Sequence, residues 1–204
     1  MRISIIGTGM IATEVISMLR TEGKGIEITS LFSHSDKEKA QSLAKANRIA
    51  RVYTDYTQLL KEDNADFVYI ALVNSAHYDY VRQALEADRN VIVEKPFTTS
   101  LSQAEELASL ARSRNLYLFE AVSLLHTPNF KLVKDSLTRI APIHLVQCNY
   151  SQYSIRFERY LQGDIAPAFN PKLGGGAMND LNVYNINIII GLFFFLLTTS
   201  YYAN

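Results

Sequence analysis

Lys95 stands at a position where a charged side chain can meet a ligand. It follows Val91–Val93, a β-branched run that predicts a buried parallel strand, and it is flanked by Glu94 and Pro96. In an open α/β sheet, ligands bind at the carboxyl ends of the strands. Lys95 is therefore a candidate functional residue, although the Glu94-Lys95-Pro96 motif by itself is equally compatible with the end of a strand and a solvated lysine.

A glycine-rich turn near the amino terminus is the second candidate. Strand Arg2–Ile6 runs into the segment Gly7–Ala12 and then into an apolar-periodic helix, which is the setting of a dinucleotide-binding fingerprint. Gly7 permits the tight turn, Gly9 lets the backbone approach a pyrophosphate, and small Ala12 allows the helix to pack closely on the strand, while the helix N-terminus supplies amides and a positive dipole end. The residues predicted to bind the dinucleotide here are Gly7, Thr8, Gly9, Met10 and Ile11.

A third candidate follows the glycine run Gly174–Gly176. A helix is expected from about Ala177, and on it Asp180 and Tyr184 are four residues apart, so their side chains share one face. One site could use both. The alternative is that Tyr184 packs and Asp180 caps early helical amides.

The residues after the second predicted strand, Ile26–Phe32, bear on which dinucleotide is bound. An acid at the end of this strand would bind the ribose 2′-hydroxyl of NAD, but this chain has Ser33, His34 and Ser35 there. No carboxylate at these positions repels a 2′-phosphate, the hydroxyls can donate hydrogen bonds, and His34 can stack or pair with an adenosine phosphate. We therefore predict NADP as the cofactor, with NAD as the alternative; an ordinary polar turn is the other interpretation.

Four motifs together resemble one family. They are the Gly7–Ala12 fingerprint, Glu94-Lys95-Pro96, Phe119–Ala121 with Pro128, and the segment from Gly174 through Asp180 to Tyr184. Their order and spacing are similar to those of the glucose-fructose oxidoreductase and inositol dehydrogenase family, often written Gfo/Idh/MocA. Tyr184 stands where many relatives have histidine, which resembles the dihydrodiol and xylose dehydrogenase branch.

The resemblance implies an NAD(P)-dependent oxidoreductase that transfers a hydride between nicotinamide and a secondary alcohol of a sugar, polyol or cyclic diol. It implies that Lys95 is the catalytic lysine and that Asp180 and Tyr184 belong to the reacting site. A nearby ammonium would move the pKa of a tyrosine from about 10 toward working pH, and the sequence leaves open whether Tyr184 or Lys95 transfers the proton. By the same resemblance, the residues that border the cofactor are Ala71, Leu72, Asn74, His77, Glu94 and Lys95. His77 is alternatively only an early-helix residue.

Six strands that alternate with helices over residues 1–120 are expected to position these groups. The predicted strands are Arg2–Ile6, Ile26–Phe32, Arg51–Tyr53, Phe67–Ala71, the Val91 strand and Leu116–Phe119. This alternation predicts an α/β fold, with a Rossmann doubly wound parallel sheet as the NAD(P)-binding domain. Residues 121–204 are predicted to form an incomplete α+β substrate-binding domain, with a long strand from Ile143 to about Tyr153.

Composition excludes several classes of partner. The 204 residues include 20 basic and 20 acidic side chains, so there is no charge footprint for nucleic acid or an anionic membrane surface. Cys148 is the only cysteine, which excludes an internal disulfide, predicts no metal site and fits a reducing cytoplasm; no export signal is expected. The uncharged segment Ile188–Leu197 is shorter than the ~20 apolar residues of a membrane span and is expected to be a buried helix end or strand.

The end of the chain at Asn204 affects the functional expectation. Members of the family are generally longer and complete a large open sheet in the second domain, commonly used for dimerisation. We expect a truncated or divergent carboxyl end, and a homo-oligomer if that sheet is complete. The expected partner is a small sugar or polyol substrate. The alternative function is a non-catalytic dinucleotide-binding sensor or an inactive truncated relative.

Overall fold

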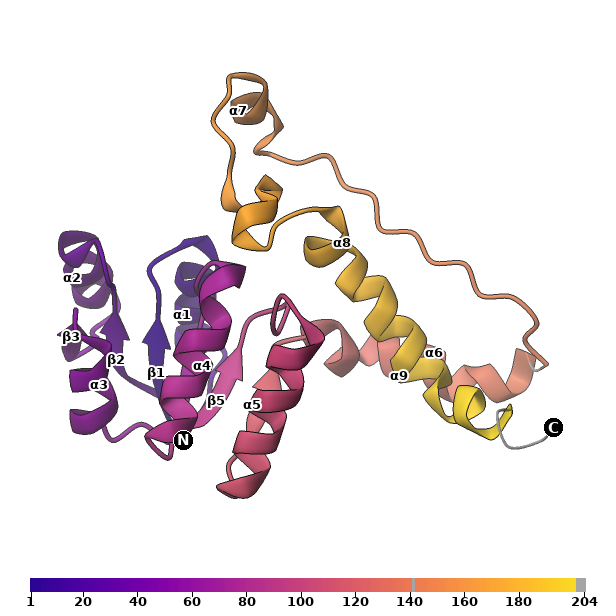
Figure 1. Ribbon diagram of the computed structural model, residues 1–204, viewed down its shortest axis with the longest axis horizontal. Coiled ribbons are helices and arrows are strands. Elements are labelled where there is room, and N and C mark those ends of the chain that lie inside the picture. Colours follow the sequence, from indigo (N-terminus) through magenta and orange to yellow (C-terminus); the bar gives the residue numbers. More distant parts are fainter. Residues whose placement is uncertain (141, 201–204) are drawn as a thin grey trace. The chain divides into compact units, whose positions relative to one another are not determined.

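The computed structural model describes residues 1–140 and 142–200, with side chains described as far as Phe193. The chain divides into two compact units, Met1–Ala121 and a second that begins at Val122. Figure 1 traces both units along the chain.

The first unit alternates strands and helices as predicted. Its strands are β1 (Arg2–Ile6), β2 (Glu27–Phe32), β3 (Arg51–Tyr53), β4 (Phe67–Ile70), β5 (Asn90–Val93) and β6 (Leu118–Glu120). Its helices are α1 (Met10–Thr21), α2 (Lys37–Ala46), α3 (Tyr56–Glu62), the 3₁₀ turn η1 (Asn74–Ala76), α4 (His77–Glu86) and α5 (Leu101–Ser113). The last strand begins two residues later than the sequence predicts.

All neighbouring strands pair in parallel, in the order β3-β2-β1-β4-β5-β6. The order reverses between β1 and β4, which is the switch point at which open α/β sheets bind ligands. The predicted doubly wound parallel sheet is confirmed.

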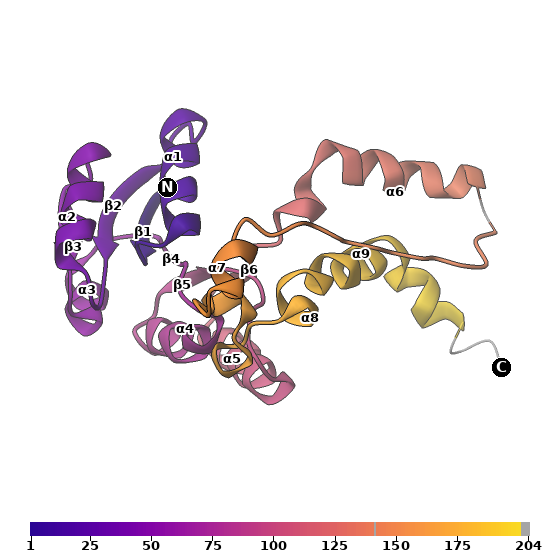
Figure 2. The same ribbon diagram turned by 90° about the horizontal axis from the view of Figure 1, so that it is seen from above.

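Because successive side chains of a strand point to opposite faces, each face of this sheet has its own hydrophobic core. On one face Ile3, Ile5 and Leu31 pack with Ala12 and Ile16 of α1 and with the small residues of α2. On the other face Val68 and Ile70 of β4 and Val91 and Val93 of β5 pack against α3, α4 and α5. The near-continuous apolar strands follow from burial on both faces, and the two views show the layers (Figures 1 and 2).

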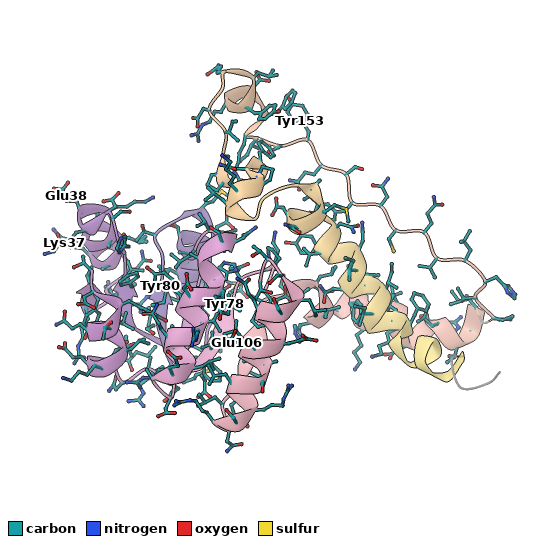
Figure 3. All side chains as sticks on the ribbon, viewed as in Figure 1. Lys37, Glu38, Tyr78, Tyr80, Glu106 and Tyr153 are labelled. Atoms are coloured by element: carbon teal, nitrogen blue, oxygen red, sulfur yellow. The ribbon has the colours of Figure 1, made fainter. Side chains whose placement is uncertain are left out.

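Helices α4 and α5 lie side by side over the second face. Tyr78 of α4 donates to Glu106 of α5 at 2.8 Å, and both side chains are labelled in Figure 3. Ser100 with Gln103 three residues later is a capping-box pattern that predicts the start of a helix. The structure confirms this cap of α5, since the Ser100 hydroxyl accepts from the Gln103 amide at 3.4 Å. These contacts fix α5, and with it the turn that joins β5 to α5.

The regular elements in the described part of the second unit are all helical. Its elements are η2 (Ser123–His126), α6 (Pro128–Ile140), α7 (Phe157–Leu161), η3 (Pro167–Phe169), η4 (Pro171–Leu173), α8 (Ala177–Asp180) and α9 (Asn182–Ser200). Helix α9 packs closely on η2 and α6 at Gly191, where an added Cβ would lie 2.7 Å from the Phe130 ring. Among the described residues no helix is both long and apolar enough to cross a membrane.

The strand predicted from Ile143 to about Tyr153 is wrong. Residues 142–154 form no strand, and Leu145 and Tyr153 are 84% and 70% exposed. A β-strand is stabilised by a neighbour that satisfies its backbone groups and buries one face. The described part of the second unit contains no other strand to serve as that neighbour.

The prediction of one helix carrying both Asp180 and Tyr184 also needs correction. Helix α8 ends at Asp180, Leu181 forms a turn, and Tyr184 belongs to α9. Asparagine is frequent in this segment, and its side-chain amide can form hydrogen bonds with backbone groups that a continuous helix would use. Asn179 does so, since its side-chain amide donates to the Gly174 carbonyl at 3.1 Å.

The uncharged segment Ile188–Leu197 is expected to be a buried helix end or strand. Residues Ile188–Phe193 are helical, as one of these alternatives predicts, but their side chains are only partly buried, and Ile190 is 47% exposed. The side chains of Phe194–Leu197 lie outside the described residues.

Asp63, at the end of α3, joins that helix to β2. Its carboxylate accepts from the Thr29 hydroxyl at 2.8 Å, the Ser30 hydroxyl at 2.6 Å and the Asn64 amide at 2.9 Å, and the residue is only 4% exposed. A buried carboxylate is tolerated because both of its oxygens accept hydrogen bonds.

We expect Asp63→Ala to lower the free energy of unfolding by about 3 kcal/mol, because the buried Ser30 hydroxyl loses its acceptor and a cavity forms. Urea denaturation measures the change. Glu105→Ala, at an exposed position of α5, is the control and should stay within about 0.5 kcal/mol of the parent. An equal stability of the two variants would contradict the assigned role of Asp63.

Candidate active site

The strand register brings the predicted cofactor residues of the first unit to one edge of the sheet. Ile6 pairs with both Phe32 and Ile70, and Val93 pairs with both Ile70 and Glu120. These strands therefore end in line. The residues that directly follow them are Gly7, Ser33, Ala71, Glu94 and Ala121.

Gly7 is required by the fold itself. Its φ of +121° is unfavourable for residues with a side chain, and an added Cβ would lie 2.3 Å from the Ala71 carbonyl oxygen. The Gly7 amide donates to the Phe32 carbonyl at 2.9 Å. The tight turn after β1 thus depends on the absence of a side chain at this position.

Gly9 is different, because nothing in the described part of the chain requires a glycine there. Its φ is −72°, and an added Cβ would have no described atom within 4 Å. Gly9 is the N-cap of α1, no side chain caps this helix, and its first turn contains no acid. Free amides, a positive dipole end and open space above the backbone fit a diphosphate group.

The neighbours of Gly9 are consistent with such a surface. Met10 and Ile11 are 46% and 37% exposed, whereas Ala12 is fully buried in the core against β1, as its small size predicts. Thr8 is half-buried. The fingerprint segment thus divides into residues that hold the turn and residues that face outward.

At the end of β2 the polar residues have separate roles. Ser33 is 5% exposed and its hydroxyl accepts from the Asp36 amide at 3.3 Å, whereas His34 and Ser35 are exposed. Asp36, the first acid after the strand, caps α2 by accepting from the Lys39 amide at 2.9 Å. The side chains presented outward in this turn are therefore those of His34 and Ser35.

The loop after β4 is tied to the neighbouring strand. The Ala71 amide donates to the Ile6 carbonyl at 2.9 Å, Leu72 packs on the core, and Asn74 begins the 3₁₀ turn η1. His77 then opens α4, but it does not face outward, because it is fully buried.

The imidazole of His77 lies between two loops. Its Nδ1 is 2.9 Å from the Pro96 carbonyl oxygen and its Nε2 is 3.2 Å from that of Leu72. Burial lowers the pKa of His77, although the carbonyls oppose that effect, so the ring is neutral at pH 7 and carries one proton. Both carbonyl oxygens can only accept, and the shorter contact favours Nδ1 as the donor, to the Pro96 carbonyl. In this structure His77 joins the β4 and β5 loops from within the unit.

Glu94, directly before Lys95, is anchored to the sheet. Its amide donates to the Ile70 carbonyl at 2.9 Å, and its carboxylate accepts from the Tyr69 hydroxyl at 2.5 Å and from the Lys95 amide at 3.3 Å. Burial, and then the charge of Glu94, raise the pKa of Tyr69. Tyr69 therefore stays a hydrogen-bond donor at neutral pH and holds the Glu94 carboxylate.

Glu120 joins this group from the end of β6, and the sequence predicts no role for it beyond its motif. Its carboxylate accepts from the Phe97 amide at 2.8 Å. Burial first, and then the charge of Glu94, raise the pKa of Glu120, while the Phe97 amide and the charge of Lys95 oppose this. The sequence signal was present, since Glu120 ends the strand beside the one that leads to Lys95.

Asp180 and Tyr184 lie in the second unit, whereas Lys95 lies in the first. The backbone amide of Asp180 donates a hydrogen bond to the Gly176 carbonyl at 2.9 Å, and Gly176 has a φ of +112°. The Tyr184 ring stacks on Tyr150, with centroids 5.2 Å apart and planes at 21°. Within the described residues, no group of three or more histidine, cysteine, aspartate or glutamate side chains could hold a metal ion.

The fingerprint and the sheet both lie in a part of the chain that matches one protein-family model. The Gfo/Idh/MocA model, described as an oxidoreductase family with an NAD-binding Rossmann fold, matches residues 1–122. This chain belongs to that family. The resemblance drawn from the four motifs is thereby confirmed, and the first unit is the family's NAD-binding domain.

Named relatives extend the match over most of the chain. The chain is 32% identical over 192 residues to the uncharacterized oxidoreductase YgjR of Escherichia coli and 30% identical over 192 residues to the scyllo-inositol 2-dehydrogenase (NADP(+)) IolU of Bacillus subtilis. Each match covers 94% of this chain but 58% of the relative. The fold is similar to that of a Lactobacillus casei scyllo-inositol dehydrogenase, with a TM-score of 0.82 and 17% identity over 94% of this chain and 55% of that one.

The contrast between Gly7 and Gly9 is testable. We expect Gly9→Ala to keep the unfolding midpoint of the parent but weaken dinucleotide binding at least about tenfold, because the new methyl group occupies space that only a ligand would fill. Gly7→Ala should instead lower the unfolding free energy by about 3 kcal/mol through its clash and its strained φ. Thermal unfolding and fluorescence titration with NADPH and NADH measure the two effects. Unchanged binding by the Gly9→Ala variant would contradict the assignment.

Proposed function

We propose that this protein is an NAD(P)-dependent oxidoreductase acting on a secondary alcohol of a sugar, polyol or cyclic diol. The observation that carries the proposal is Lys95 at the carboxyl edge of the sheet, two strands away from a helix N-terminus fit for a diphosphate. Family membership supports the hydride chemistry, and the name of the relative IolU supports an inositol or similar polyol as the substrate.

The bound nicotinamide would supply the acceptor or donor of the hydride. Lys95 would hydrogen-bond the reacting oxygen and stabilise its negative charge while the hydroxyl proton departs. Asp180 and Tyr184 are proposed for the same reaction from the family motif, with Asp180 orienting Tyr184 or a substrate hydroxyl. The proton is taken by Tyr184 or by Lys95.

The end of β2 supports NADP as the preferred cofactor. With Ser33 turned inward and Asp36 engaged in capping α2, the groups left to meet a 2′-phosphate are His34 and Ser35, neither of which is anionic. A site without a carboxylate avoids charge repulsion with that phosphate.

We expect NADPH to bind at least about tenfold more tightly than NADH. His34→Asp should reverse this preference by charge repulsion, whereas the neutral control His34→Asn should weaken NADPH binding without favouring NADH. Fluorescence titration of the parent and both variants with each nucleotide decides the matter. Equal affinities of the parent for the two nucleotides would overturn the NADP assignment.

Lys95→Met tests the catalytic proposal. The substitution keeps the length and packing of the side chain and removes its charge, so turnover should fall at least about a hundredfold while NADPH affinity stays within about threefold. Nicotinamide absorbance with scyllo-inositol, other polyols and aldoses is the measurement. Lys61→Met, at an exposed lysine of α3, is the control and should keep parental turnover.

The same assay separates the enzyme from a dinucleotide-binding protein without activity. Both would bind the nucleotide, but only the enzyme shows an absorbance change that depends on substrate. Absence of turnover by the parent chain with every substrate would contradict the proposed function, and normal turnover of Lys95→Met would contradict the role of the lysine.

A further inference from the structure

One peptide unit next to Lys95 is held at both of its polar groups. The carbonyl of Pro96 accepts from His77 Nδ1 at 2.9 Å, and the amide of Phe97, in the same peptide plane, donates to Glu120 Oε1 at 2.8 Å. The two side chains come from different elements, α4 and β6. A peptide held from both sides cannot rotate without breaking both hydrogen bonds.

Burial makes these two hydrogen bonds costly to break. His77 is fully buried and Glu120 is half-buried. Hydrogen bonds in such surroundings are stronger than in water, and a carboxylate acceptor strengthens the one to the Phe97 amide further. The imidazole, the peptide and the carboxylate also form a chain in which each hydrogen bond polarises the next.

We infer that His77 and Glu120 are positioning residues that clamp the Pro96–Phe97 peptide and thereby fix the backbone that carries Lys95. On the other side of Lys95, the Glu94 amide is tied to the Ile70 carbonyl at 2.9 Å. Lys95 therefore lies between two anchored peptides. The catalytic consequence rests on the proposed function, because a lysine that stabilises a reacting oxygen must be held in place before the reaction.

Two variants of Glu120 distinguish the length of its side chain, which lets it contact the Phe97 amide, from its negative charge. Glu120→Gln keeps an acceptor oxygen at the same distance from the backbone and removes the charge. Glu120→Asp keeps the charge and withdraws the carboxylate by one methylene, beyond reach of the Phe97 amide. Glu105→Asp, on the exposed surface of α5, is the matched control for the shortening.

Amide hydrogen exchange and ¹⁵N relaxation test the clamp without cofactor or substrate. In Glu120→Asp the exchange of the Phe97 amide should accelerate at least about tenfold and the Lys95 amide should become more mobile, whereas Glu120→Gln and Glu105→Asp should resemble the parent. His77→Asn, whose Nδ2 can donate where Nδ1 does, and His77→Ala form the same pair on the carbonyl side. Unchanged Phe97 exchange and Lys95 mobility in Glu120→Asp and His77→Ala would overturn the clamp.

Turnover then tests the consequence for Lys95. Glu120→Asp should lower kcat at least about tenfold while the Kd for NADPH stays within about threefold, and Glu120→Gln should retain kcat within about threefold. If kcat in Glu120→Gln is as low as in Glu120→Asp, the charge of Glu120 and not its hydrogen bond to Phe97 supports turnover, and the inference is refuted. If the parent chain has no turnover, the proposed function fails, and exchange at Phe97 with mobility at Lys95 decides the clamp independently.

Discussion

The parallel pairing of β1 with both β2 and β4 is the constraint on which the first unit depends. Because Ile6 lies between Phe32 and Ile70, three strands end at one level, and the turn at Gly7 must pass against the Ala71 carbonyl. Every later feature of this edge follows from that register. The N-terminus of α1, the polar turn after β2 and the Lys95 turn after β5 all lie at carboxyl ends of strands in one sheet.

Buried and half-buried polar side chains gather at the same edge, and each of them has a hydrogen-bond partner. Tyr69 holds Glu94, Glu120 holds the Phe97 amide, and His77 holds the Pro96 carbonyl. Desolvation raises the pKa of Tyr69 and of Glu120 and lowers that of His77. Such a group of perturbed titratable side chains is typical of functional sites, and here its hydrogen bonds converge on the backbone around one lysine.

The two units differ in how their chain segments are stabilised. In the first unit each strand has a neighbour, and both faces of the sheet are covered by helices. In the second, residues 142–154 have the composition of a strand but no paired neighbour among the described residues. The chain spans 58% of the length of the two curated relatives it matches.

The sequence by itself determined the features that depend on local pattern. The alternation of apolar strands and amphipathic helices, the glycine turn after β1, the Ser100 cap and the position of Lys95 at a strand end can all be recognised within a few residues. Family membership followed from the spacing of such local motifs. The two glycines of the turn show what local pattern cannot reveal. Only the structure shows that a side chain at Gly7 would clash with the Ala71 carbonyl, whereas the space above Gly9 is open.

Only the tertiary structure decided which distant groups meet. His77 and Glu120 reach the same peptide from 19 and 23 residues away, and their orientation depends on the packing of α4 and on the register of β6. The sequence left open whether His77 borders the cofactor or is only an early-helix residue, and packing buries its side chain within the unit. The predicted strand after Ile143 and the single helix through Leu181 failed for a related reason. Local propensity is a weak preference, and pairing partners or competing side-chain hydrogen bonds override it.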